Sequence, residues 1–365
     1  MKKPLLIPVM VVFVAGMILG ACAAPSPAPS QPTAPAKPAP AQPIELTIAL
    51  GSPPGHTNTV TWERWAKEVE EATKGRVKFK TFIGGALLKE PEICDGILKG
   101  IADAGNFLPA FTPGRFNVLE AFELPGLGPS SGTSSSMAMW EAFKTIKPAE
   151  YKDFKMLWCA SPGSAHIGTV KKPVRNLADI KGMEIRGSGI TKNALDALGA
   201  VGVAIPMPET PIALQKGIVD GVAHTLETIV TEKFGDYFKW NTICYVYSAF
   251  RFHAGMNLQK WNSLPPDIQK IINDISDGYA KKHGEQMDIN HEKGWKFMQD
   301  NKIEVIRLAP DEYERWVKAW EPVRNKWVAD MKAKGLPADD YVKMATDLLA
   351  KYYKQYPDPI AKYMK

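Results

Sequence analysis

Arg186 is the residue whose type and position most directly suggest a chemical role. It ends a short predicted strand, residues 183–186, and glycines follow at positions 187 and 189. A guanidinium placed there could project into a cleft and hold a carboxylate through two parallel hydrogen bonds. A desolvated contact of this kind contributes about 1.5–3 kcal/mol. From the local sequence alone, an exposed or salt-bridged structural arginine remains the better interpretation.

Four of the six histidines also fall in predicted loops or strand ends that could line a cleft: His56, His166, His224 and His253. Imidazole can donate to a ligand oxygen, and its charge changes near pH 6.5. A zinc site is the competing interpretation, but no close pair such as i, i+4 supports it. We therefore predict no metal and no cofactor, and take His56, His166 and His224 as candidate ligand contacts. A lone histidine is more often structural. The other two histidines, His283 and His291, are expected to face solvent.

Three further side chains are candidates for the same cleft. Phe107 lies near the end of a buried predicted strand. Phe250 belongs to the aromatic stretch 245–252, which we expect to be a strand returning to the first half of the fold. Only one face of a strand can meet a cleft, so most of these aromatic rings should be core. Glu227 could accept a ligand hydroxyl, orient a histidine, or simply begin a helix.

The motifs of common catalytic sites are missing. The sequence has no His-Glu-x-x-His, Walker or Cys-x-x-Cys pattern. Nothing places a nucleophile beside a base, although triads assemble from distant residues. The sequence therefore favours a protein that is not an enzyme.

The elements that must position these residues follow two β/α units. Alternating apolar residues predict a strand at 46–50, a helix at 57–74, and further strands at 76–83 and 102–108. The same order recurs over 183–224, and the last third is helical, beginning with a long helix over 266–298. Parallel sheets with right-handed crossovers are implied. Two such units suggest two lobes, with a ligand beyond the carboxyl ends of the strands.

The first 43 residues are expected to direct the protein to its cellular location rather than to form part of the folded body. Residues 1–21 combine two early lysines with an apolar run too short to span a membrane, and the string LGAC ends at Cys22. This string resembles a bacterial lipobox, which implies cleavage before Cys22 and lipidation of its sulfur; a plain signal peptide is the alternative. Residues 22–43 are rich in proline and predict an extended tether.

The amino-acid composition excludes several other classes of protein. The chain has 365 residues, 45% of them hydrophobic and 23% charged, which are ordinary globular values. The net charge of +6 comes from 45 basic and 39 acidic residues without a dense basic block, so no nucleic-acid partner is implied. The other cysteines, Cys94, Cys159 and Cys244, are odd in number and widely spaced, which predicts buried thiols rather than disulfides.

A resemblance then changes the interpretation of Arg186. The stretches KPV and LADIKGMEIR, followed by ALDALGA, PMP and ALQKGIVDG, resemble the core signature of the TRAP transporter solute-binding proteins, the DctP-like family. Looser similarities at 73–77, 124–127 and 261–265 extend the resemblance over about residues 46–308.

The resemblance implies an α/β, two-lobed periplasmic-binding-protein-like fold of type II, with a hinge and a long cross-lobe helix. Lobe I would be 44–163, with about 250–290 returning to it. Lobe II would be 164–249, with about 291–365 packing on it. Arg186 matches the family arginine that pairs with the ligand carboxylate. The protein would lie in the bacterial envelope, on the periplasmic or extracytoplasmic face, held to a membrane by its lipid anchor.

The resemblance also implies partners: a small organic acid, and the small and large integral membrane subunits of the transporter. Two departures affect the ligand. Residues 164–167 read SAHI, where many members carry a second arginine, and His224 stands where many have asparagine. Without a second cation, a monocarboxylate with an uncharged or aromatic body is favoured. The alternatives are an envelope enzyme acting on a carboxylated substrate and a ligand-presenting sensory protein.

Overall fold

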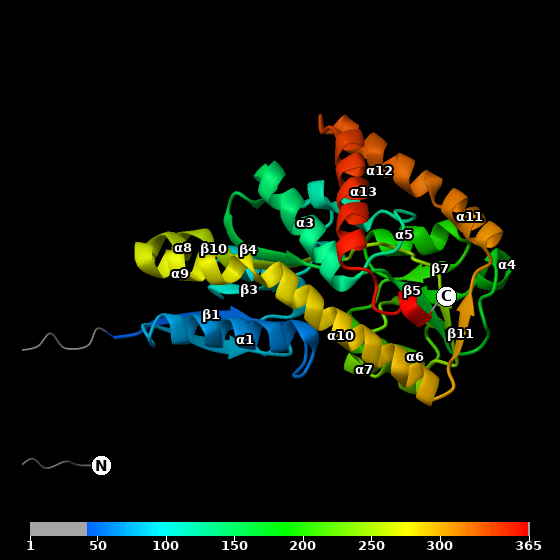
Figure 1. The fold of residues 1–365 in the computed structure, drawn as a ribbon, viewed down its shortest axis with the longest axis horizontal. Helices are drawn as coiled ribbons and strands as arrows, with labels where there is room; N and C mark the ends of the chain where they lie inside the picture. Colours follow the sequence, from blue (N-terminus) through cyan, green and yellow to red (C-terminus); the bar gives the residue numbers. More distant parts are fainter. Residues whose placement is uncertain (1–41, 364–365) are drawn as a thin grey trace, which may run out of the picture. The chain divides into compact units, whose positions relative to one another are not determined.

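The alternation of apolar residues at 46 and 48 does form a strand, and that strand lies inside a five-stranded sheet. The computed structural model describes residues 42–363 (Figure 1). In the first sheet the strands are β2 (Val77–Phe82), β1 (Ile44–Ala49), β3 (Ala104–Phe107), β10 (Phe252–Asn257) and β4 (Phe154–Ala160), in that order. The first three are parallel, as predicted, because α1 (Thr57–Ala72) and α2 (Ile93–Leu98) connect them. Strand β10 runs antiparallel between β3 and β4.

A second sheet of six strands forms the other lobe. Its order is β11 (Glu304–Arg307), β9 (Trp240–Ile243), β5 (His166–Thr169), β8 (Gly221–His224), β6 (Glu184–Arg186) and β7 (Val201–Val203). The helices inserted between these strands are α4 (Leu177–Ile180), α5 (Ile190–Ala197), α6 (Thr210–Gln215) and α7 (Thr228–Thr231). Strands β6, β7 and β8 are parallel, so the carboxyl ends of β6 and β8 lie at the same edge. That edge carries Arg186 and His224. The predicted two-lobed α/β fold is confirmed.

The chain passes between the sheets more than once. It leaves β4 for β5, leaves β9 for β10, and returns to the second sheet at β11. The strand expected over 245–252 does not form before Phe252, where β10 begins, and Tyr245 has a positive φ of 51°. The reason is that this segment crosses between sheets and so has no sheet neighbour. It pairs with the other crossing segment instead: Val246 N–H donates to Ala165 O, and Ala165 N–H to Tyr247 O, at 2.9 and 3.1 Å.

The predicted long helix is present as a pair of helices that meet at Gly278. After α8 (Leu258–Ser263), the chain forms α9 (Pro266–Asp277) and α10 (Tyr279–Asp300). Helix α10, yellow to orange in Figure 1, contacts α1 and α3 (Gly132–Ile146) of the first lobe and α7 of the second. It is the cross-lobe helix that the resemblance implied.

Glycines allow α10 to approach both lobes closely. A Cβ built on Gly284 would lie 2.6 Å from the carbonyl oxygen of Gly132, at the start of α3. A Cβ built on Gly294 would lie 1.9 Å from the carbonyl oxygen of Leu226, just before α7. Any larger residue at 294 must therefore displace the backbone beside Glu227.

The C-terminal helices are α11 (Pro310–Ala319), α12 (Glu321–Ala333) and α13 (Ala338–Gln355). The tryptophans of these helices are buried, and the helices contact both lobes. Trp320 Nε1 donates to Ala194 O in α5, whereas Trp327 Nε1 donates to Glu120 of the first lobe. Helix α13 packs against α3, so the tail expected on the second lobe also covers the first.

Some predictions concern residues outside the described range: the signal peptide, Cys22 and most of the tether. Within 42–363, no helix is both long and apolar enough to cross a bilayer. Cys94, Cys159 and Cys244 are buried free thiols, as predicted.

Candidate functional site

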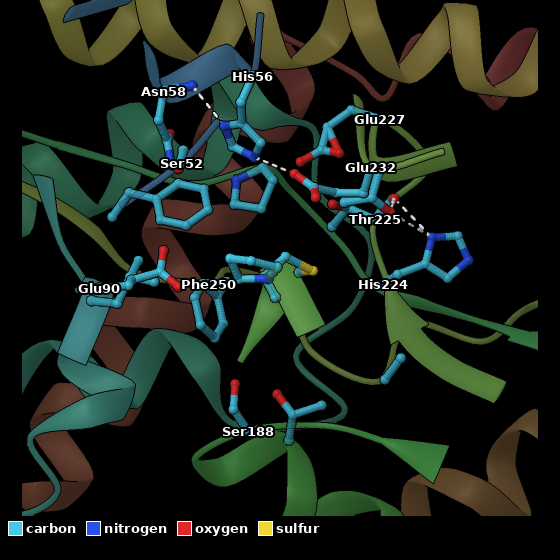
Figure 2. A pocket seen from close by; sticks show the side chains of 18 of the residues that line it. Ser52, His56, Asn58, Glu90, Ser188, His224, Thr225, Glu227, Glu232 and Phe250 are labelled. Carbon is cyan, nitrogen blue, oxygen red and sulfur yellow. Dashed lines mark hydrogen bonds and ion pairs between the residues drawn. The ribbon is translucent and has the colours of Figure 1, made fainter. Parts of the chain in front are cut away.

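A pocket with an empty volume of about 750 Å³, which includes its open mouth, is lined by residues from both lobes. Ser52, His56 and Glu90 come from the first lobe and Glu227 from the second (Figure 2). Arg186, at the end of β6, also comes from the second lobe. A mostly apolar lining with a few polar groups is typical of sites for small organic molecules. Most of the remaining lining is apolar or aromatic: Pro53, Leu108, Phe111, Pro162, Met207, Pro208, Tyr247, Phe250 and Phe252.

Arg186 is the fixed cation of the pocket. It ends β6 and is only 6% exposed, and its Nε donates to Ile205 O at 2.9 Å. Its two terminal nitrogens make no hydrogen bond to any described residue. Burial lowers the pKa of Arg186, an effect opposed by nearby Tyr247, Glu90 and Glu232. The guanidinium therefore has two donor nitrogens available for a planar acceptor.

His56 lies beside Arg186's acidic neighbours but is not a second cation. Its Nδ1 accepts from Asn58 N–H at 3.1 Å, capping α1, so the neutral ring carries its proton on Nε2. Nε2 lies 3.3 Å from Glu232 Oε1 (Figure 2). Burial lowers the pKa of His56 to about 4. At neutral pH the contact is therefore between a carboxyl group and a neutral imidazole rather than an ion pair.

His224 lines the pocket, but both of its ring nitrogens are already used. Nδ1 lies 2.9 Å from Thr225 O, and Nε2 lies 2.8 Å from Asn241 Oδ1. Burial lowers the pKa of His224 to about 4, so only one nitrogen carries a proton. The Thr228 hydroxyl donates to Thr225 O, which leaves Nδ1 as the donor. We therefore assign the Asn241 amide the reverse orientation, which also gives its otherwise unpartnered Nδ2 an acceptor. His224 positions the end of β8 rather than presenting a donor to a ligand.

Three glutamates surround the remaining space. Burial raises the pKa of Glu227 to about 8, and those of Glu90 and Glu232 to about 7. One oxygen of each, Oε2 of Glu90 and Glu227 and Oε1 of Glu232, is buried without a hydrogen-bond partner among the described residues. Figure 2 shows Glu90 on one side of the pocket and the other two on the opposite side. The pocket thus holds more acceptors than its own donors can satisfy.

The structure brings most, but not all, of the predicted site residues to this pocket. Arg186, His56, His224, Glu227 and Phe250 line it. His166 does not: it is fully buried, 5.4 Å in ring-centroid distance from Tyr245. Phe107 does not either, because it stacks on Phe154 in the core of the first lobe, at 5.0 Å between ring centroids.

Other predictions about these side chains need correction or addition. His283 and His291, expected to face solvent, are fully buried because α10 is covered by both lobes. His253 is also buried, against Phe107. Glu90 and Glu232 were missed. The only sequence signal for Glu90 is a lone carboxylate just before Pro91, beyond the end of a predicted strand. Among the described residues, no cluster of His, Cys, Asp or Glu is suited to hold a metal.

Comparison with known proteins places the fold and the pocket in context. The sequence model of the DctP family, described as bacterial extracellular solute-binding protein family 7, matches residues 49–330. A solute-binding protein of Verminephrobacter eiseniae is 27% identical over 292 residues, covering 78% of this chain and 84% of that one. A TRAP periplasmic solute-binding protein of Desulfovibrio salexigens, solved as an open complex, is 33% identical with a TM-score of 0.77, covering 88% of this chain and 99% of that one.

A third relative has a described ligand. It is a marine metagenome TRAP solute-binding protein specific for aromatic acid ligands, solved with metahydroxyphenylacetate. It is 28% identical to this chain, with a TM-score of 0.80, and the match covers 85% of this chain and 99% of that one.

Proposed function

Because the chain belongs to the DctP family of bacterial extracellular solute-binding proteins, we propose that its pocket captures a small organic acid for a TRAP-type secondary transporter. The ligand's carboxylate binds the two free terminal nitrogens of Arg186, and this is the observation that carries the proposal. The ligand is a monocarboxylate, because the pocket's histidines are neutral and Arg186 is the cation that lines it. Its body has an apolar or aromatic part, since phenylalanines, prolines and Met207 form much of the wall.

Closure of the two lobes strengthens the contact with Arg186. Removing water from around an ion pair lowers the local dielectric and increases the attraction between the charges. One arginine contact does not supply a dissociation constant of about one micromolar, near −8 kcal/mol. Apolar burial, at about 25 cal/mol per Å², supplies the rest. The protein binds and releases its ligand unchanged and acts as a carrier rather than an enzyme.

A thermal-shift screen of monocarboxylates, dicarboxylates and aromatic carboxylates tests this function. The ligand should raise the melting temperature of the wild type, and Arg186→Ala should abolish that rise. The matched control is Arg175→Ala, which removes an arginine of the same lobe that pairs with Glu304 at the surface. The control should respond as the wild type does. Equal shifts in Arg186→Ala and wild type would refute the assigned role.

The lipobox-like string and the tether motivate the proposal for how the protein is held in the envelope. A diacylglycerol thioether on Cys22 would keep the binding body beside the small and large membrane subunits, at the periplasmic or extracytoplasmic face. Cys22→Ala should move the protein from the membrane fraction to the soluble fraction of disrupted cells. If the variant stays with the membrane, the anchor is not at Cys22.

A further inference from the structure

The pocket contains three glutamates, which is unusual for a site that binds a ligand with only a carboxylate group. Arg186 supplies one positive charge, and Glu90, Glu227 and Glu232 face the same space. Each of the three has a buried oxygen without a hydrogen-bond partner among residues 42–363. Leaving a polar oxygen buried and unpaired costs about 1–3 kcal/mol, and more for a charged group. A hydrocarbon body offers no hydrogen-bond donor to these oxygens.

The positions of the charges divide the pocket into two ends. Arg186 is electrostatically close to Glu90 and Glu232, and it offsets part of the burial effect that raises the pKa of each. No cation acts on Glu227, which is 2% exposed: burial and the like charge of Glu232 raise its pKa, and only hydrogen bonds from Thr225 and Thr228 lower it. Glu227 therefore marks the end of the pocket where a positive charge is missing, and a cation bound there would favour its ionised form.

Protein groups near Glu227 and Glu232 do not neutralise this end. The imidazole of His56 is neutral and places one N–H toward Glu232, but not within hydrogen-bonding geometry. His224 uses both ring nitrogens on Thr225 and Asn241. Aromatic rings line the same pocket, and an aromatic face attracts a cation. Carboxylates beside aromatic rings are suited to an ammonium group.

We propose that the ligand is a zwitterion: a carboxylate bound by Arg186 and a cationic nitrogen bound by Glu227 and Glu232, joined by a compact, partly apolar body. The inference rests on the proposed function and replaces the uncharged body that the sequence favoured. A cationic nitrogen donates to the oxygens that lack partners and favours the ionised form of both carboxyl groups, with release of the proton that Glu227 otherwise retains. A neutral hydroxyl would donate to such an oxygen but would not favour its ionisation.

Isothermal titration calorimetry with matched pairs of probes tests the proposal. Para-aminomethylbenzoate and para-ethylbenzoate have almost the same shape and differ in the cationic nitrogen; phenylalanine and phenylpropanoate form a second pair. For the pair whose size suits the pocket, we expect the zwitterion to bind at least about tenfold more tightly, a difference of about 1.4 kcal/mol. The opposite order, or equal affinities in both pairs, overturns the inference.

Two variants test where the cationic nitrogen lies. Glu227→Gln keeps the shape and an acceptor oxygen but cannot ionise to pair with an ammonium group, so the affinity for the zwitterion should fall by about tenfold relative to the affinity for the neutral probe. Glu232→Gln should act in the same direction. The matched control is Glu314→Gln on the exposed surface of α11, which should leave the preference unchanged. An unchanged preference in both pocket variants contradicts the proposal.

The outcomes separate the two proposals. If neutral monocarboxylates bind through Arg186 and zwitterions do not, the function stands and the zwitterion inference falls. If zwitterions bind equally well to Arg186→Ala and wild type, the role of Arg186 falls instead. If neither member of either pair binds, the inference is rejected for both aromatic bodies.

Discussion

Two buried arginines in this chain show how a binding residue differs from a structural one. Arg251 is 2% exposed, and protein partners occupy both of its terminal nitrogens: its Nη2 donates to Glu123 at 3.1 Å, and its Nη1 donates to Phe116 O. Burial alone would lower the pKa of Arg251, but Glu123 and Glu120 raise it. Arg186 is as deeply buried, yet only its Nε has a partner. The donors that the fold leaves unused are the ones available to a ligand.

This contrast predicts opposite effects on stability. Arg251→Ala leaves the buried carboxylate of Glu123 without its cationic partner and should lower the free energy of unfolding by about 3–5 kcal/mol. Arg186→Ala removes a buried cation with one hydrogen bond, so the unliganded protein should lose little. Urea denaturation of both variants without ligand makes the comparison. A large loss in Arg186→Ala would show that this residue mainly holds the fold.

The sequence identified Arg186 because a strand end, two glycines and a family signature coincide there. It did not identify Glu90 or Glu232, because neither belongs to a recognisable motif, and only the closeness of the lobes makes them pocket residues. His166 was expected at the cleft because it lies near a strand end. Its side chain is instead enclosed by Tyr245 and His291 from other segments, which no local pattern could reveal.

At the scale of elements, α10 connects the lobes and fixes the segment that carries Glu227. It contacts α1 and α3 on one side and α7 on the other. Gly294 lies where a side chain would meet the carbonyl oxygen of Leu226. The close approach of this helix therefore depends on glycine rather than on the apolar pattern that identified the helix.

Gly294→Ala should disturb both stability and binding. Because the added Cβ would lie 1.9 Å from Leu226 O, the backbone beside Glu227 must move. Overpacking of this kind typically costs about 1–3 kcal/mol. Gly278→Ala is the matched control on the same pair of helices, since its nearest neighbour would be Ile275 O at 3.8 Å. Thermal denaturation should separate the two variants, and identical melting temperatures would argue against a tight contact at Gly294.

Regular elements were predictable where a periodic pattern is local. The parallel strands of each lobe and the late helix follow from alternation and capping. The stretch 245–251 was not, because its aromatic residues resemble a strand although the segment crosses between two sheets and pairs with no strand. The antiparallel insertion of β10 likewise depends on a return of the chain that sequence spacing does not encode.

At the scale of the whole molecule, buried titratable groups predict how stability depends on pH. Glu227 has a folded pKa of about 8, above the usual 4.5, so between these values the unfolded chain has released a proton that the folded chain retains. The unfolding free energy therefore falls as pH rises through this window. Buried histidines such as His56, with a pKa lowered to about 4, act in the opposite direction, but only up to about 6.5.

The unliganded protein should therefore lose stability between about pH 6.5 and 8, where the carboxyl groups act alone. Glu227→Gln should make the decline shallower, and Glu314→Gln should not. Urea titrations at several pH values measure this dependence. A stability that rises across this range in the wild type would contradict the assignment of these carboxyl groups as buried and protonated.

The central claim is that a ligand carboxylate binds the free end of Arg186 between the two lobes. A crystal structure of the protein with its tightest-binding acid tests it most directly. The account predicts both terminal nitrogens of Arg186 within hydrogen-bonding distance of the carboxylate, with side chains of both lobes around the ligand. A carboxylate bound elsewhere, with Arg186 turned to a protein partner, would contradict it.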